Sequence, residues 1–64
     1  MDDIKYMGSS YDKHRKRWLA KVPGMKLGYF YTNIEAALAH DEHLFRANHD
    51  TPYHLLNFPP EEFS

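Results

Sequence analysis

The sequence predicts an α+β fold, in which a three-stranded antiparallel sheet packs on one C-terminal α-helix. Apolar and polar residues alternate along residues 17–22, as they do in a half-buried strand. Pro23-Gly24 follows at once, and this turn dipeptide returns the chain into a second apolar and aromatic run. Thr32 then stands three residues before Glu35, which is the spacing of a capping box at a helix N-terminus.

A glycine interrupts both the first and the third expected strand. In the first, residues 6–11, Gly8 indicates a β-bulge or a close approach of neighbouring backbone. In the third, residues 25–31, Gly28 breaks the alternation. A bulge there would shift the register, so that the apolar residues on either side of Gly28 both reach the core.

The two faces of the second strand, residues 17–22, differ in chemistry. One face is apolar and is expected to pack on the helix, and it carries Trp18, Ala20 and Val22. The other face is expected to stay open, and it carries Arg17, Leu19 and Lys21. The second and third strands are therefore expected to form a hairpin with one packed and one basic face.

The capping box predicts a helix that runs to about Asn48. Its expected buried stripe consists of apolar residues at helical spacing: Ile34, Ala37, Leu38, Leu44 and Phe45. Asp41 falls on the same stripe and requires hydrogen-bond donors if it is buried. Glu42 and Arg46 are spaced for an ion pair on the outer side. The apolar residues 55–60 are expected to fold back over an edge of the core.

Charge is sorted along the chain, although the net charge is only −1. Residues 1–12 have a net charge of −2, residues 13–31 of +6, and residues 32–64 of −5. A basic hairpin of this kind is suited to a polyanion. The alternative is that its charges only keep the hairpin solvated.

Length and composition exclude several classes of protein. With 64 residues, one domain is expected over residues 5–60, with flexible ends at 1–4 and 61–64. The absence of cysteine excludes a disulfide framework and a thiolate zinc site. No apolar run approaches the roughly 20 residues that cross a bilayer, and the acidic start does not resemble a signal peptide, so an intracellular protein is expected.

Short motifs follow one another in a fixed order over residues 6–59. They are Tyr6-x-Gly8, Arg17-Trp18-x-Ala20-x-Val22, Leu27-Gly28-x-Phe30-x-Thr32, Glu35-Ala36-Ala37-x-Ala39-His40-Asp41 and Leu56-Asn57-Phe58-Pro59. In this order and spacing they resemble the APETALA-two/ethylene-response-factor DNA-binding domain of plant transcription factors and their relatives in other lineages. The resemblance implies a sheet whose open face lies in the major groove of double-stranded DNA, and, in a eukaryote, a nuclear protein that regulates transcription.

Transferred to this chain, the resemblance implies DNA contact through the open face and the turn at its margin. The expected contact residues are Lys13, His14, Arg15, Arg17, Leu19, Lys21 and Lys26. Arginines that members of the family carry in the first strand are replaced here by Met7, Ser10 and Asp12. A second hypothesis follows from these replacements, in which the same fold contacts a protein through its helix and C-terminal tail within a larger nuclear or chromatin complex.

No catalytic, metal or cofactor site is expected. The segment His40-Asp41-Glu42-His43 spaces its histidines three apart, unlike the H-E-x-x-H arrangement of zinc hydrolases. No nucleophile stands beside a base, and no glycine-rich phosphate loop precedes the helix, so neither enzyme activity nor a small-molecule ligand is expected. Most aromatic residues fall on core positions; the exceptions, which could stack on unpaired bases, are Tyr29 and Tyr31.

Overall fold

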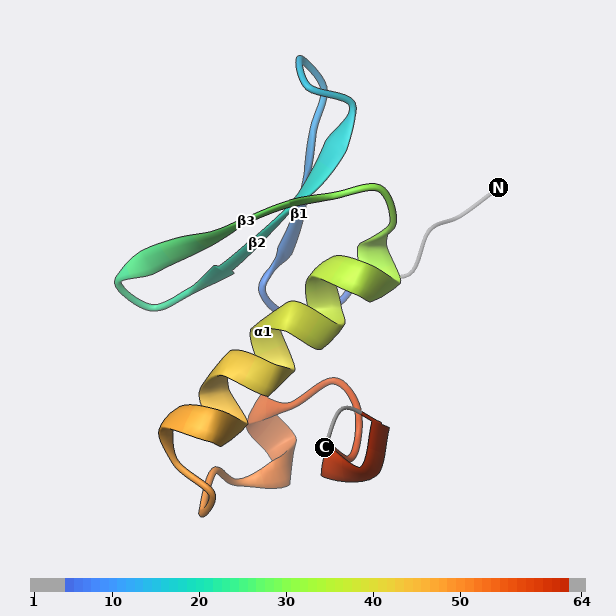
Figure 1. Cartoon of the computed structure of the whole chain (residues 1–64). Coiled ribbons are helices and arrows are strands. Elements are labelled where there is room, and N and C mark those ends of the chain that lie inside the picture. Colours follow the sequence, from blue (N-terminus) through green and yellow to red (C-terminus); the bar gives the residue numbers. More distant parts are fainter. Residues whose placement is uncertain (1–4, 63–64) are drawn as a thin grey trace.

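The computed structural model describes residues 5–62, and it confirms the α+β prediction. Three antiparallel strands form one sheet in the order β1-β2-β3: β1 (Ser9–Asp12), β2 (Arg17–Val22) and β3 (Met25–Phe30). Helix α1 (Asn33–Ala47) follows, and then two short 3-10 helices, η1 (Tyr53–Leu55) and η2 (Pro60–Glu62). Figure 1 shows α1 running beneath the twisted sheet, with the C-terminal segment folded back beside the helix.

The first strand begins later than the sequence predicts, at Ser9 instead of residue 6. The reason lies in the tail, because Asn57 bonds both backbone groups of Met7: its Oδ1 accepts from the Met7 N–H at 2.7 Å and its Nδ2 donates to the Met7 carbonyl at 2.9 Å. Gly8 then turns the chain with a φ of 75°. Its carbonyl accepts from the backbone N–H of Lys21 at 2.9 Å, so the close approach predicted at this glycine is confirmed.

A bulge in β3 sets the register of the second hairpin. Ala20 pairs with Gly28, whereas the next residue, Lys21, pairs with Lys26, so that one residue of β3 is left without a partner across the ladder. Gly28 has a φ of 147°. The predicted register shift is therefore confirmed, and two half-buried side chains of β3 both face α1: Leu27 and Phe30.

The helix begins and ends as the sequence predicts. Thr32 Oγ1 accepts from the backbone N–H of Glu35 at 3.1 Å, and Glu35 Oε1 accepts from the backbone N–H of Thr32 at 3.0 Å, which completes the capping box. Asn48 is the C-cap residue. Glu42 and Arg46 form the predicted ion pair at 3.0 Å.

The predicted buried stripe of α1 is confirmed at Ala37 and at Asp41, which the sequence placed on it, and it was wrong at Ile34. The buried residues of the helix are Ala36, Ala37, His40 and Asp41, whereas the side chain of Ile34 is 49% exposed. The short alanine side chains allow the helix to lie close to the sheet at Ala20, which is fully buried. Small residues thus form the side of α1 that packs on the sheet. Larger apolar residues lie half-buried beside this side: Leu38, Leu44 and Phe45.

The tail, residues 55–60, folds back over an edge of the core, as predicted. Leu56 and Pro60 are buried, and the ring of Phe58 lies 5.1 Å from the ring of Tyr6 between centroids. Residues 61 and 62, expected at a flexible end, belong to η2. The other expected flexible residues, 1–4 and 63–64, lie outside the described residues. No helix within residues 5–62 is long and apolar enough to cross a membrane.

Candidate nucleic-acid interface

The face of the sheet that points away from α1 is basic. Residues paired directly across an antiparallel ladder share a face. Leu19 pairs with Ser10 and Tyr29, and Lys21 pairs with Lys26, so these residues stand on the side opposite to the buried Ala20. We define the open face as Ser10, Asp12, Arg17, Leu19, Lys21, Lys26 and Tyr29, with Tyr31 and the turn residues 13–16 at its margin.

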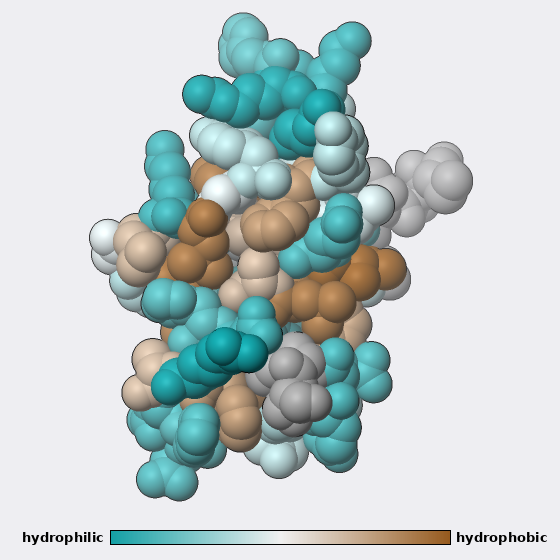
Figure 2. Space-filling view, in the orientation of Figure 1, coloured by the Kyte–Doolittle hydropathy of each residue, from teal (hydrophilic) through white to brown (hydrophobic). Residues whose placement is uncertain are grey.

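The β1–β2 turn brings cations to one end of the open face. Oδ1 of Asp12 accepts from the backbone N–H groups of His14 and Arg15 at 2.9 and 3.0 Å, and Oδ2 lies 3.1 Å from Nη1 of Arg15. The bond from the Arg15 backbone holds the pKa of the Asp12 carboxyl below its ordinary value. Figure 2 shows the hydrophilic surface that gathers over this turn, at the top of the view.

The two arginines beside this turn are stacked on tyrosines. The guanidinium carbon of Arg17 lies 4.0 Å from the ring centroid of Tyr31, and that of Arg15 lies 4.6 Å from the ring centroid of Tyr29. Nη1 of Arg17 also donates to the carbonyls of Arg15 and Lys16 at 3.3 and 3.0 Å. Both bonds use Nη1, so within residues 5–62 the Nε and Nη2 donors of Arg17 stay available to a ligand. Stacking on the rings restricts the orientation of both guanidinium planes.

Two lysines face each other at the other end of the open face. Lys21 and Lys26 are direct partners across the β2–β3 ladder, and both side chains are exposed. Like charges in direct opposition destabilise a sheet. No acidic side chain within residues 5–62 forms an ion pair with either lysine. The pair is thus a local concentration of positive charge that an external anion can neutralise.

The residues predicted to contact DNA fall into two groups in space. Arg17, Leu19, Lys21 and Lys26 share the open face, and Lys13, His14 and Arg15 occupy the turn at its end. Their contact with DNA stays a prediction.

The prediction of DNA-contacting residues omitted three residues that lie beside them in the structure. Lys16 lies in the same turn with a φ of 55°, and the basic run at residues 13–17 could have included it. Tyr29 and Tyr31 hold the arginines. The sequence marked both tyrosines as exposed aromatics, but their partners depend on the register of β3.

The hydrogen bonds around His40 and Asp41 join α1 to the C-terminal tail. The Nδ1 atom of His40 lies 2.7 Å from Oδ1 of Asp41, and Asp41 also accepts from three donors of the tail, the backbone N–H groups of Asn57 and Phe58 and the Asn57 side chain. The buried Asp41 carboxylate therefore has the hydrogen-bond donors that its expected structural role requires. Among the residues that the structure describes, no three His, Asp or Glu side chains come together as metal ligands.

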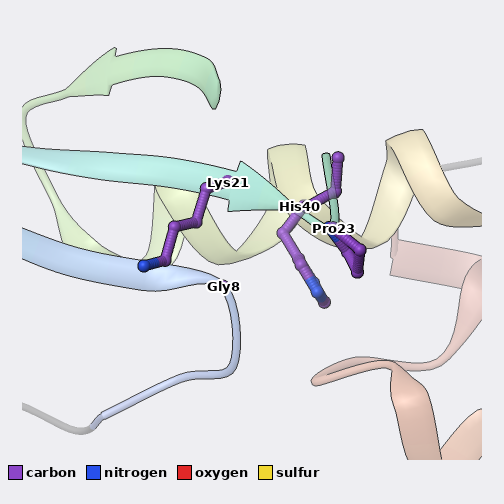
Figure 3. Close-up of a pocket in the computed structure, with 5 residues that line it drawn as sticks. Gly8, Lys21, Pro23 and His40 are labelled. Carbon is purple, nitrogen blue, oxygen red and sulfur yellow. The ribbon is translucent and has the colours of Figure 1, made fainter. Parts of the chain in front are cut away.

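A shallow pocket of about 420 Å³ lies beside this cluster, between α1, the end of β2 and the start of β1. Its lining consists of Gly8, Lys21, Val22, Pro23 and His40. In Figure 3 the Lys21 side chain points away from His40, so the two polar side chains of the lining do not converge on one point. The pocket thus lacks the convergent polar groups that orient a small ligand.

Comparisons of the chain with models of protein families, with curated proteins and with solved structures find no match. The likeness of its motifs to the APETALA-two domain thus remains an interpretation of the sequence.

Proposed function

We propose that the protein binds double-stranded DNA with the open face of its sheet in the major groove, as the DNA-binding module of a transcription regulator. The observation that carries the proposal is the Lys21–Lys26 pair, two exposed cations held in direct opposition with no acidic partner within residues 5–62. A sheet retains such a repulsive pair at low cost when a polyanion binds it.

The size of the sheet fits the groove. Three strands spaced about 4.8 Å apart make a face about 10 Å across, and the major groove of B-DNA is about 12 Å wide. The cations lie at both ends of the open face, in the β1–β2 turn and at the Lys21–Lys26 pair. This arrangement suits anchoring of the phosphate backbone at both ends, with the middle of the sheet left to approach base edges.

A strained lysine supports the same conclusion. Lys16 adopts a φ of 55°, a left-handed conformation that glycine or asparagine occupies more readily. The left-handed conformation costs an ordinary residue about 1–2 kcal/mol, so the turn keeps a cation where a smaller residue would be more stable. Strain that brings no benefit to the fold is typical of functional positions.

The direct test is a titration of a 20-base-pair duplex, followed by fluorescence anisotropy at several salt concentrations. With about four phosphate contacts, the plot of log Kobs against log salt concentration is expected to have a slope of about −4. The variant Lys21→Gln/Lys26→Gln is expected to bind more weakly and to reduce the slope by about 2. Both side chains are exposed, so the substitution leaves the core intact.

The matched control is Glu42→Gln, which removes one charge on α1, on the other side of the sheet. It is expected to leave the affinity and the salt slope unchanged within error. Absence of binding at low salt would refute the proposal, and so would equal effects of the lysine variant and the control.

A second candidate is contact with a protein partner through α1 and the tail. Its support is the pair of exposed apolar side chains on η1, Tyr53 and Leu55. A photo-crosslinking amino acid placed at position 53 or at position 26 in the parent cell separates the two candidates. Crosslinks to protein from position 53, without crosslinks to DNA from position 26, would favour the partner; the reverse pattern would favour DNA.

A further inference from the structure

The centre of the open face is apolar, although both of its ends are cationic. Leu19 stands in the middle strand, between Ser10 of β1 and Tyr29 of β3. Leu19 is half-buried; Tyr29 is 38% exposed, and its ring lies beneath the Arg15 guanidinium. We call Leu19 and Tyr29 the apolar centre.

Leu19 lies outside the core of the domain. The core of the domain lies on the other side of the sheet, where Ala20 and Val22 pack towards α1. On the solvent side of a strand a polar residue is the ordinary choice. An apolar side chain at the centre of a charged surface is therefore a feature that a ligand would explain.

The cations on either side restrict what that ligand is. Arg17 and Lys21 stand two residues before and after Leu19 on the same face, which is about 7 Å in each direction along the strand. When these cations lie near phosphates, the side chain between them points to the floor of the groove. Most groups on that floor are hydrogen-bond donors and acceptors, and the thymine C5-methyl group is the apolar exception.

Leucine cannot satisfy a base donor or acceptor, so placing it on a guanine edge would leave polar atoms without partners. We propose that the apolar centre contacts a pyrimidine 5-methyl group, so that the protein prefers duplexes with a 5-methyl pyrimidine beneath Leu19. This inference rests on the proposed function, since it concerns the same face of the sheet. The methyl group has two sources in DNA, thymine and 5-methylcytosine.

The test compares four 20-base-pair duplexes of equal charge: alternating A·T, the same duplex with uracil in place of thymine, alternating G·C, and the same duplex with 5-methylcytosine. Each substitution changes only the methyl group, while the number of phosphates stays constant. Burial of one methyl corresponds to about a fourfold change in Kd. The A·T duplex is therefore expected to bind about fourfold more tightly than its uracil counterpart.

The cytosine arm identifies the source of the methyl group. A matching gain with 5-methylcytosine supports recognition of the methyl group in either base, and no gain there restricts the preference to thymine. Equal affinity within both duplex pairs would overturn the inference and leave duplex binding intact. Failure to bind any of the four at low salt would overturn both.

Variants of Leu19 separate recognition by this side chain from effects of the methyl group on DNA shape. Leu19→Ala is expected to bind the thymine and uracil duplexes equally, and Leu19→Met to retain the preference. The control is Ile34→Ala, which shortens an exposed apolar side chain of α1 away from the open face. A thymine preference that survives in Leu19→Ala, with the fold verified by circular dichroism, would also overturn the inference.

Discussion

Replacing Asp41 by asparagine tests whether one buried carboxylate holds the tail against the helix. Asp41 is 0% exposed. Its Oδ2 atom accepts from the backbone N–H groups of Asn57 and Phe58 at 2.8 and 2.7 Å, and its Oδ1 atom lies 3.0 Å from Asn57 Nδ2 and 2.7 Å from His40 Nδ1. The substitution Asp41→Asn keeps the size of the side chain and removes its charge together with one acceptor oxygen.

The expected loss follows from these contacts. A hydrogen bond to a charged group contributes about 1.5–3 kcal/mol, and a buried donor without a partner costs about 1–3 kcal/mol. In either orientation, the amide NH2 of asparagine faces at least one donor nitrogen of Asn57, so we expect a loss of about 3 kcal/mol in the free energy of unfolding. The total free energy of unfolding of a domain of this length is about 3–10 kcal/mol, so the variant is expected to be close to unfolding.

Urea unfolding followed by far-ultraviolet circular dichroism measures this loss directly, and thermal unfolding followed by the same signal measures the melting temperature. The melting temperature is expected to fall by more than about 12 °C, since a domain of this size loses about 4–8 °C per kcal/mol. The control is Glu42→Gln, which removes the exposed Glu42–Arg46 pair and is expected to change stability by less than about 0.5 kcal/mol. An Asp41→Asn variant as stable as this control would refute the role assigned to the carboxylate.

Four further substitutions test the turns. Gly8→Ala is expected to lower the free energy of unfolding by about 3 kcal/mol, because at a φ of 75° the new Cβ would collide with the His40 ring. Gly24→Ala, where the new Cβ enters open space at a φ of 94°, is expected to lower it by only about 1 kcal/mol. Thermal unfolding measures both losses, and equal losses would contradict the predicted collision. Lys16→Gly is expected to gain about 1 kcal/mol in urea unfolding while weakening duplex binding, and a loss of stability would show that its backbone is not strained. In Asp12→Asn the effect depends on pH. The pKa of the Asp12 carboxyl in the folded protein lies below its ordinary value of 3.8, so the ionised carboxyl stabilises the fold above that value and loses this contribution as the pH falls through the folded pKa. The stability difference between the Asp12 variant and the natural chain is thus expected to shrink on acidification, and a difference that grows would contradict the assignment.

The sequence alone predicts which residues of β2 lie on the open face, but it does not predict how the arginines stack on tyrosines. Alternation along β2 places Arg17, Leu19 and Lys21 on one side without knowledge of any other element, because successive side chains of a strand point to opposite faces. Lys26 joins them because the bulge in β3, which Gly28 indicated in the sequence, changes the pairing after Ala20. The Arg–Tyr stacks likewise depend on register and on the shape of the β1–β2 turn.

Local chemistry alone determined the capping box, the Pro-Gly turn and the length of α1, because each depends on residues a few positions apart. The tertiary structure decided that Ala36 and His40 are buried on α1 while Ile34 is exposed, and where β1 begins. Both depend on contacts between distant residues: Met7 bonds to Asn57, 50 positions away, and Asp41 bonds to the same tail. No periodicity within a single segment encodes such contacts, because they join residues 16 and 50 positions apart.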